Sequence, residues 1–284
     1  MWLTINIILN LHAALFLGSF GVSVMGIVAI VWTIDCFVGF YLTLPASVGR
    51  FWQRWKLAWQ VKWRASAFRV NFDLHRASGL WFWPVLLVFA CSSVMLNLPA
   101  VYHWVADFIF DYRPAAGGMS MSTGEERPPR LDFRAALSIA QRLMAEQAAS
   151  HGFSVKRPTV FMLNAEDQSY FYNVKSSRDI WDDRDNESFT TLTFDGDTGA
   201  LRSLNLPTSE HAGNTISNWL QGLHEAWVFG FPYQIFVSVL GLLIAMLSAT
   251  GVYIWWTKRQ GRGLAARKLD SFTQTPAQPK SGTL

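Results

Sequence analysis

Residues 223–256 read LHEAWVFGFPYQIFVSVLGLLIAMLSATGVYIWW, a stretch that joins a histidine to a long apolar run with no charged residue between 233 and 256. About 20 apolar residues suffice for a helix to cross roughly 30 Å of bilayer hydrocarbon. Two other stretches, roughly 15–44 and 79–102, are also long and apolar enough. The sequence therefore predicts an α-helical integral membrane protein with three transmembrane helices.

The composition agrees with a membrane location. Of the 284 residues, 51% are hydrophobic and 15% are charged, and the 14 Trp and 21 Phe are of a type favoured where a bilayer meets water. Cys36 and Cys91 both lie in apolar runs, and no C-x-x-C-H sequence is present. These observations argue against a disulfide framework, and they exclude a thiolate-held metal cluster and covalent attachment of a c-type haem.

The basic residues are concentrated in two segments. Seven lie between the first two spans against one acid, Asp73, and six lie in the tail after residue 257 against Asp270. The stretch 103–223 carries 11 Lys and Arg and 16 Asp and Glu, a net charge of −5. Because cytoplasmic loops are rich in Lys and Arg, we expect both basic segments in the cytoplasm and residues 104–222 in the periplasm, across a bacterial inner membrane. The overall charge of +4 then reflects two basic cytoplasmic segments that outweigh an acidic exterior stretch. We therefore expect no nucleic-acid partner.

These boundaries divide the chain into seven parts. They are a first transmembrane part (1–45), a basic Trp-rich cytoplasmic loop (46–76), a second transmembrane helix (77–103), a linker (104–130), a periplasmic domain (131–210), a third transmembrane part (211–257) and a basic tail (258–284). Three spans with a cytoplasmic C-terminus place the N-terminus outside, yet neither a basic n-region nor a cleavage site is present. We therefore expect a preceding transmembrane helix that this sequence lacks.

The predicted periplasmic domain is a small α+β unit. Apolar residues recur at helical spacing from Asp132, an N-cap candidate, to about residue 150. β-rich runs follow, with a turn before the last of them: 158–164, 169–175, 188–194, Asp195–Gly199 and 200–204. We expect one helix on a small antiparallel sheet, with His151 and His211 as isolated surface residues.

The cytoplasmic loop has tryptophans at spacings of three and four, with basic residues between them: Trp52, Trp55, Trp59 and Trp63. Such a segment can lie in the headgroup region of the lipid bilayer, with its aromatic face toward the hydrocarbon and its basic groups toward anionic lipid. A docking surface for a cytoplasmic electron donor is the alternative.

An internal repeat relates the first span to the third at an offset of 212 residues, without a gap. The matched pairs are Leu11 with Leu223, His12 with His224, Ala14 with Ala226, Gly18 with Gly230, Gly39 with Gly251 and Tyr41 with Tyr253. Both helices run in the same direction, so the repeat places the two histidines at equal depth. The 27 residues from each histidine to the second glycine correspond to about 40 Å of straight helix, which places both histidines at the outer membrane face.

The paired histidines predict a metal cofactor. Two neutral imidazoles at one depth on neighbouring helices suit the axial positions of a non-covalent b-type haem, whose iron takes two nitrogen donors. His12 and His224 are therefore candidate ligands of the iron of an outer haem. The alternative is a helix-end or substrate-contact role.

Two further histidines mark the ends of the second span. His75 stands at its cytoplasmic end and His103 at its outer end, 28 residues later. About 42 Å of helix separates them, so they cannot share one iron. His75 is either a ligand of an inner haem iron or an interfacial residue beside Arg76. His103 is interpreted as an aromatic-belt residue, with ligation of the outer haem iron as the alternative.

The order of these segments resembles one known family. The L-H-x-A helix, the stretch WTIDCFVGFYLTLP (Trp32 to Pro45), the stretch NFDLHRASGLW (Asn71 to Trp81), the helix-plus-sheet domain and the L-H-E helix are similar to PepSY-associated transmembrane proteins. The similarity extends to about residue 262, and TFDGDTG (Thr193 to Gly199) resembles the strand–turn signature of a PepSY domain. Full-length members have an additional first helix with an H-R motif and a first PepSY domain.

The resemblance implies an inner-membrane oxidoreductase with two b-type haems that passes electrons to a periplasmic ferric siderophore. It implies that His12 and His224 bind the outer haem and that His75 binds the inner haem, whose other ligand lies on the helix that this sequence lacks. A quinol or a cytoplasmic reductase is the implied electron donor. Unless a partner subunit supplies the missing helix, we expect an inactive fragment.

The sequence is also compatible with two other functions. One is a non-enzymatic membrane protein whose PepSY-like domain binds a peptide or regulates a protease. The other is an accessory subunit of an iron-uptake transporter.

Overall fold

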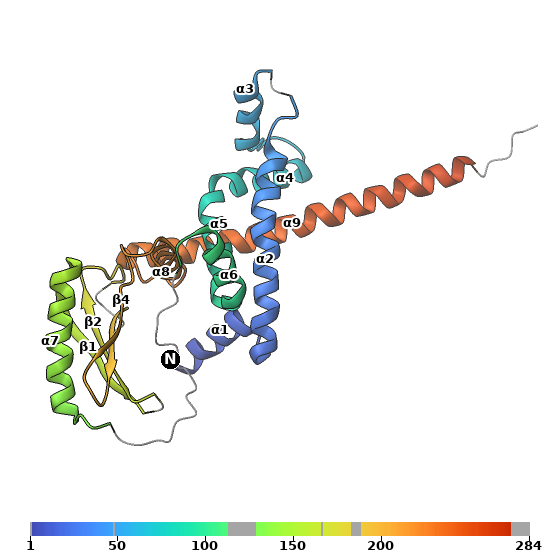
Figure 1. Ribbon diagram of the computed structural model, residues 1–284. Coiled ribbons are helices and arrows are strands. Elements are labelled where there is room, and N and C mark those ends of the chain that lie inside the picture. Colours follow the sequence, from blue (N-terminus) through green and yellow to red (C-terminus); the bar gives the residue numbers. More distant parts are fainter. Residues whose placement is uncertain (1, 48, 113–128, 166, 183–188, 274–284) are drawn as a thin grey trace, which may run out of the picture. The chain divides into compact units, whose positions relative to one another are not determined.

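The computed structural model describes residues 2–47, 49–112, 129–165, 167–182 and 189–273 (Figure 1). The chain divides into two compact units, each built from two segments. Unit 1 consists of Met1–Ile34 and Leu87–Ile235, and unit 2 consists of Asp35–Leu86 and Phe236–Leu284. The fold is mostly helical, with one small antiparallel sheet, as the sequence predicts.

The internal repeat has a structural counterpart, because each histidine lies on a short helix that ends before a long apolar helix begins. His12 lies in α1 (Trp2–Ala14), which is followed by α2 (Gly18–Thr43). His224 ends α8 (Ala212–His224), which is followed by α9 (Gly230–Thr273). The straight-helix estimate of depth is therefore wrong, since neither histidine continues the helix that follows it.

The same left-handed backbone conformation begins both long helices. Gly18 has a φ of 57° and Gly230 a φ of 68°, in the region that glycine adopts without steric cost. Non-glycine residues in both breaks also have positive φ, namely Leu15, Phe16, Ala226 and Phe229. The glycines matched by the repeat thus mark the two points where the chain changes direction.

Within the described part of the chain, two helices are long and apolar enough to cross a membrane, Gly18–Thr43 and Gly230–Arg262. A third span is present only if α4 (Ala67–Trp81) and α5 (Trp83–Asn97) count as one, because they meet at a bend of 73°. Pro84, at the start of α5, explains the bend, since proline has no N–H to donate and its ring clashes with the carbonyl four residues earlier.

The segments around this bent pair differ from the prediction. The predicted second transmembrane helix, 77–103, is divided among α4, α5 and α6 (Pro99–Ile109). The first residues of the predicted linker, 104–130, belong to α6, and 113–128 lie outside the described residues. The predicted loop at 46–76 contains α3 (Phe51–Trp55), the 3-10 helix η1 (Lys56–Trp59) and the start of α4.

The predicted α+β domain is present in unit 1. Helix α7 (Phe133–His151) begins after Asp132, whose Oδ1 accepts a hydrogen bond from the Ala135 N–H at 2.8 Å. The four strands pair in sequence order and all antiparallel: β1 (Val155–Asn164), β2 (Ser169–Ser176), β3 (Thr190–Asp195) and β4 (Leu201–Asn205). Small residues of α7, including Ala136 and Ala140, pack on the buried aromatic and aliphatic side chains of the sheet.

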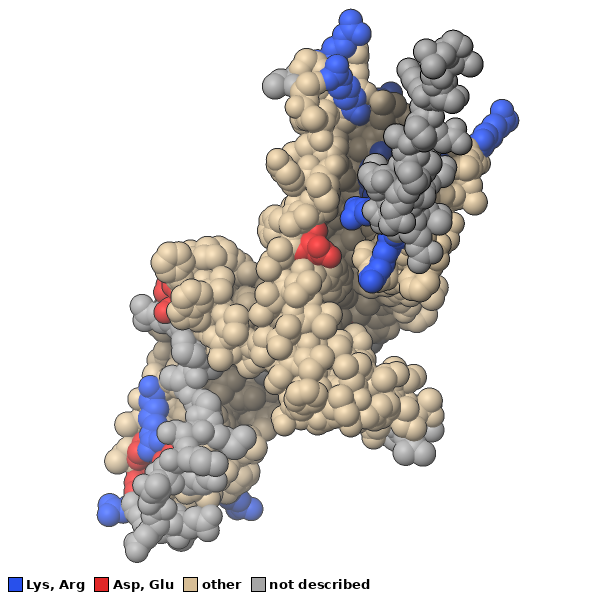
Figure 2. All heavy atoms as spheres, turned by 90° about the vertical axis from the view of Figure 1, so that its right-hand side faces the viewer, with Lys and Arg blue, Asp and Glu red and all other residues tan. Residues whose placement is uncertain are grey.

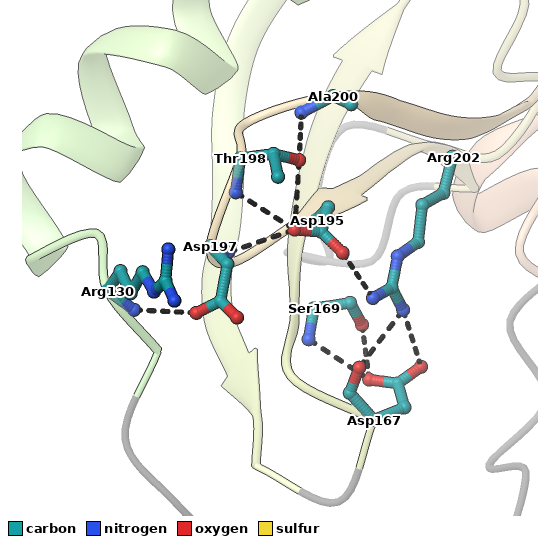
Figure 3. Close-up of polar contacts among 8 residues, drawn as sticks. All are labelled: Arg130, Asp167, Ser169, Asp195, Asp197, Thr198, Ala200 and Arg202. Atoms are coloured by element: carbon teal, nitrogen blue, oxygen red, sulfur yellow. Dashed lines mark hydrogen bonds and ion pairs between the residues drawn. The ribbon is translucent and has the colours of Figure 1, made fainter.

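The turn between β3 and β4 depends on the Asp195 carboxylate (Figure 3). Oδ1 accepts hydrogen bonds from the N–H groups of Asp197 and Thr198, at 3.0 and 2.9 Å, and Oδ2 accepts one from Arg202 at 2.7 Å. Arg202 also donates to the backbone carbonyl of Asp167 at 3.0 Å, at the turn between β1 and β2. Arg202 and the Thr198 N–H, which favour the charged form, hold the pKa of Asp195 well below its usual range.

Asp195 should make the stability of the domain depend on pH. Because its pKa is lower in the folded than in the unfolded chain, its contribution is present above about pH 4 and is lost as the pH falls further. We expect Asp195→Asn to lower the free energy of unfolding at pH 7 by about 1 kcal/mol, since the turn is partly exposed. Thermal unfolding of the full chain in detergent at pH 7 and pH 3 measures this difference. Equal losses at both pH values would contradict it, and Glu146→Gln, at an exposed position of α7, is the control.

Candidate functional site

The two histidines matched by the repeat lie side by side in unit 1. The centres of the His12 and His224 rings are 6.2 Å apart, and the ring planes are inclined by 39°. The contact joins the last turn of α1 to the last residue of α8, which are more than 200 residues apart in the chain. Among the described residues, this is the one pair of histidine rings in contact that the structure records.

The middle helix α5 supplies the surroundings of His224. The buried Ser92 hydroxyl lies 2.8 Å from Nδ1 of His224, and the Phe89 ring centre lies 5.2 Å from the imidazole centre. Burial and the neighbouring His12 lower the pKa of His224 to about 4, so the ring is neutral at pH 7. Since Nδ1 is occupied by Ser92, Nε2 is the nitrogen left for another partner.

The sheet domain holds the break that follows His224. The Asp182 N–H donates to the Trp227 carbonyl at 2.7 Å, and the Asp182 carboxylate accepts from the Gly230 N–H at 2.9 Å. A carboxylate is favourable at this position, because the first N–H groups of α9 carry the positive end of its dipole. Trp181 packs edge-on against Trp227, with ring centres 4.6 Å apart.

His75 occupies a comparable environment in unit 2. Its Nδ1 lies 2.9 Å from the Thr250 hydroxyl of α9, and Thr250 is 9% exposed. The next residue, Gly251, leaves room for the ring, since a Cβ added there would lie 3.3 Å from Cε1 of His75. The glycine that the repeat matches with Gly39 therefore lies beside a histidine.

The remaining histidines have local partners. Nε2 of His103 lies 2.9 Å from the Tyr112 hydroxyl, and the two rings stack. Nδ1 of His211 lies 2.7 Å from the Asp111 carboxylate, so His211 is not the isolated residue that the sequence suggests. His151 is exposed at the end of α7, as expected. Within the described ranges, no group of three or more His, Cys, Asp or Glu side chains is arranged to hold a metal ion.

The repeat, the bent helix pair and the helix-plus-sheet domain all lie within the region matched by one family profile. The profile of the family described as PepSY-associated TM region matches residues 2–258. The chain belongs to this family. Together with the apolar helices, membership makes the PepSY-associated chain a multi-pass membrane protein in contact with lipid. A comparison with curated proteins gives no match.

A buried ion pair holds the Trp-rich segment of this PepSY-associated chain. The Asp73 side chain is fully buried and accepts hydrogen bonds from Arg69 at 3.0 Å and Arg76 at 2.9 Å. Arg76 also donates to the carbonyls of Leu57 and Ala58, at 2.9 and 3.2 Å. The conspicuous acid of the basic loop is therefore a structural anchor between α4 and η1.

The outer surface of this segment is basic and aromatic. Lys and Arg side chains gather at the part of the molecule that contains α3 (Figure 2). Trp52 and Trp63 are exposed to 73% and 69%, whereas Trp55 packs against the rings of Trp52 and Trp59. Three of the four tryptophans thus belong to one local cluster, and Trp52 and Trp63 present exposed aromatic surface.

Three residues of the site environments were not predicted from the sequence: Ser92, Thr250 and Phe89. Ser92 and Thr250 are polar side chains within apolar stretches, which is a signal, but nothing in the sequence indicates which histidine each one contacts. Phe89 is one apolar residue among many and carries no such signal.

Loss of the Asp73 carboxylate should loosen the Trp-rich segment. Asp73→Ala leaves two arginines without their shared acceptor, and we expect the free energy of unfolding to fall by about 2–3 kcal/mol, less than for a fully buried pair. Denaturant unfolding followed by tryptophan fluorescence measures the loss. Arg69→Ala is the matched control, with an expected change below about 1 kcal/mol because Arg69 is 44% exposed. Equal effects of the two variants would contradict the anchoring role of Asp73.

His224 should remain neutral at pH values where an ordinary histidine is protonated. Its folded pKa of about 4 lies below the unfolded value of about 6.5, so folding is disfavoured as the pH falls from about 6.5 to about 4. NMR titration of the ring resonances in the purified chain tests this, and a midpoint above pH 6 would show that the ring is open to water.

Proposed function

We propose that the chain is a haem-containing oxidoreductase of the bacterial inner membrane that reduces ferric siderophore in the periplasm. The observation that carries the proposal is the contact between His12 and His224, which the repeat brings together from two distant helices. In the proposed topology, α2, the α4–α5 pair and α9 each cross the membrane. The acidic stretch 104–222 is then periplasmic, and the basic segments and the C-terminus are cytoplasmic.

The spacing of the two rings fits a shared metal. A ligating imidazole nitrogen would approach a metal to about 2 Å, so two rings that held one iron would lie close together. The rings of His12 and His224 are 6.2 Å apart. This proximity supports the proposal that the two rings would hold one iron.

The chemical state of His224 supports the same assignment. A ligating imidazole must be neutral and must direct a lone pair at the metal. Burial favours the neutral ring, and the contact of Nδ1 with Ser92 leaves Nε2 for the iron. The apolar ring of Phe89 beside His224 is the kind of neighbour that a haem macrocycle needs.

When bound, a b-type haem supplies one-electron transfer, which no protein side chain in the chain needs to assist by acid–base chemistry. His12 and His224 would hold its iron and set its potential through their basicity. One electron from a quinol or a cytoplasmic reductase reduces one ferric siderophore to the ferrous form. Ferrous iron is a softer, less charged acceptor that oxygen ligands hold more weakly, so reduction promotes release.

His75 is proposed as a ligand of a second, inner haem. Its Nδ1 contacts a hydroxyl, as in His224, and Nε2 is free of that contact. An inner haem would connect a cytoplasmic donor with the outer site. No second ligand is assigned to it.

Removal of either paired histidine should abolish the outer haem. We expect reduced-minus-oxidised absorption of the detergent-purified chain to show a low-spin b-type band, and His12→Ala or His224→Ala to lower the content of the outer haem by on the order of tenfold or more. Reoxidation of the reduced chain by ferric siderophore then tests the substrate.

His151→Ala, at the exposed end of α7, is the control and should leave the band unchanged. A wild-type chain without any such band would overturn the proposal in favour of a non-enzymatic PepSY-associated protein.

A further inference from the structure

Two buried hydroxyl groups contact the proposed haem ligands in the same way. Ser92 of α5 lies 2.8 Å from Nδ1 of His224, and Thr250 of α9 lies 2.9 Å from Nδ1 of His75. The two contacts lie in different units, on different helices, yet both involve the same ring nitrogen. None of the motifs of the sequence includes either hydroxyl.

We infer that Ser92 and Thr250 are positioning residues that fix the tautomer of these histidines, so that each ring carries its proton on Nδ1 and presents the lone pair of Nε2 to iron. The assignment of iron as the partner of Nε2 rests on the proposed function. The tautomer itself is a property of the chain and can be tested without haem.

The hydroxyl protons have acceptors other than the histidines. Ser92 Oγ lies 3.1 Å from the Phe89 carbonyl, three residues earlier in α5. Thr250 Oγ1 lies 2.8 and 3.0 Å from the carbonyls of Met246 and Leu247 in α9. A carbonyl oxygen can only accept, so in these contacts each hydroxyl donates its single proton to the carbonyl. The hydroxyl oxygen then has a lone pair that accepts from Nδ1–H.

The opposite arrangement is less favourable and unsuited to ligation. If a hydroxyl donated to Nδ1, its helix carbonyl would lose that donor and the histidine would carry its proton on Nε2. An Nε2–H group has no lone pair for a metal. Ser92 is fully buried and Thr250 nearly so, and the low-dielectric surroundings raise the cost of mispaired polar groups.

The contacts also affect how strongly Nε2 of each ring donates its lone pair to a metal. An Nδ1–H group that donates a hydrogen bond makes Nε2 more basic and holds the ring plane, as partners of metal-bound histidines commonly do. Loss of such a partner typically lowers metal affinity by about 10–100-fold. Gly251 also helps to define the position of the His75 ring, because a Cβ there would lie only 3.3 Å from Cε1.

The test uses the full chain in detergent, with variants matched on the same helices. Ser92→Ala removes the contact with His224, and its control is Ser93→Ala, whose hydroxyl donates to the same Phe89 carbonyl at 2.7 Å. Thr250→Val removes the contact with His75, and Thr250→Ser should restore it. Thr257→Val is the control on α9, since Thr257 donates to the Tyr253 carbonyl at 2.9 Å.

The first readout is ¹⁵N NMR of the ring nitrogens in the haem-free chain. We expect the Nδ1–H tautomer for His224 and His75 in the wild type, and a mixture with Nε2–H at His224 in Ser92→Ala and at His75 in Thr250→Val. The controls and Thr250→Ser should match the wild type. An Nε2–H tautomer in the wild type, or no change in the two test variants, would overturn the inference.

The second readout is haem affinity, with an expected loss of about 10–100-fold for Ser92→Ala at the outer site. If Ser92→Ala binds haem as tightly as Ser93→Ala, the positioning role is wrong although the proposed function stands. If the wild type binds no haem, the proposed function fails, and the NMR result alone decides whether the hydroxyls set the tautomers.

Discussion

The backbone break after each histidine-bearing helix is the constraint on which the arrangement of unit 1 depends. Without the breaks, each histidine would belong to the same straight helix as the apolar span that follows it. The breaks allow α1 and α8 to take directions different from those of α2 and α9. Left-handed conformation costs a non-glycine residue roughly 1 kcal/mol, so Leu15 and Phe16 are held there by the surrounding packing. Gly21 permits the tight return, because a Cβ there would overlap the Ala14 carbonyl oxygen.

Local patterns in the sequence predicted the helices and the sheet well. The amphipathic spacing after Asp132 and the turn chemistry around Asp195 act over a few residues, and the structure places α7 and the β3–β4 turn there. A hydropathy pattern contains no information about backbone dihedral angles. The prediction from it therefore treated α1 and α2 as one helix, and α4 and α5 as one straight helix. Pro84 was a visible signal for the bend, but a single proline within an apolar run does not say how far the helices turn.

Only the part of the candidate site that the internal repeat includes, His12 and His224, could be predicted from the sequence. An identical offset relating His12 to His224 implied equal placement, and the two rings do lie in contact. Ser92 and His224 are 132 residues apart and His75 and Thr250 are 175 apart, so their pairing arises from tertiary packing. Asp73 illustrates the converse case, since a lone acid among basic residues is conspicuous in sequence, but its role as an anchor requires the positions of Leu57 and Ala58.

The sheet domain contributes to the position of His224 by contact as well as by chain connectivity. Asp182 binds both sides of the break, through the Trp227 carbonyl and the Gly230 N–H, and Trp181 fills the space beside Trp227. Gly222, two residues before His224, admits Trp181, since a Cβ there would lie 3.2 Å from its ring nitrogen. Because a short helix end is held only by its neighbours, these contacts restrict the orientation of α8 and of its terminal imidazole. Through these contacts the sheet domain and the break together restrain the end of α8 on which His224 lies.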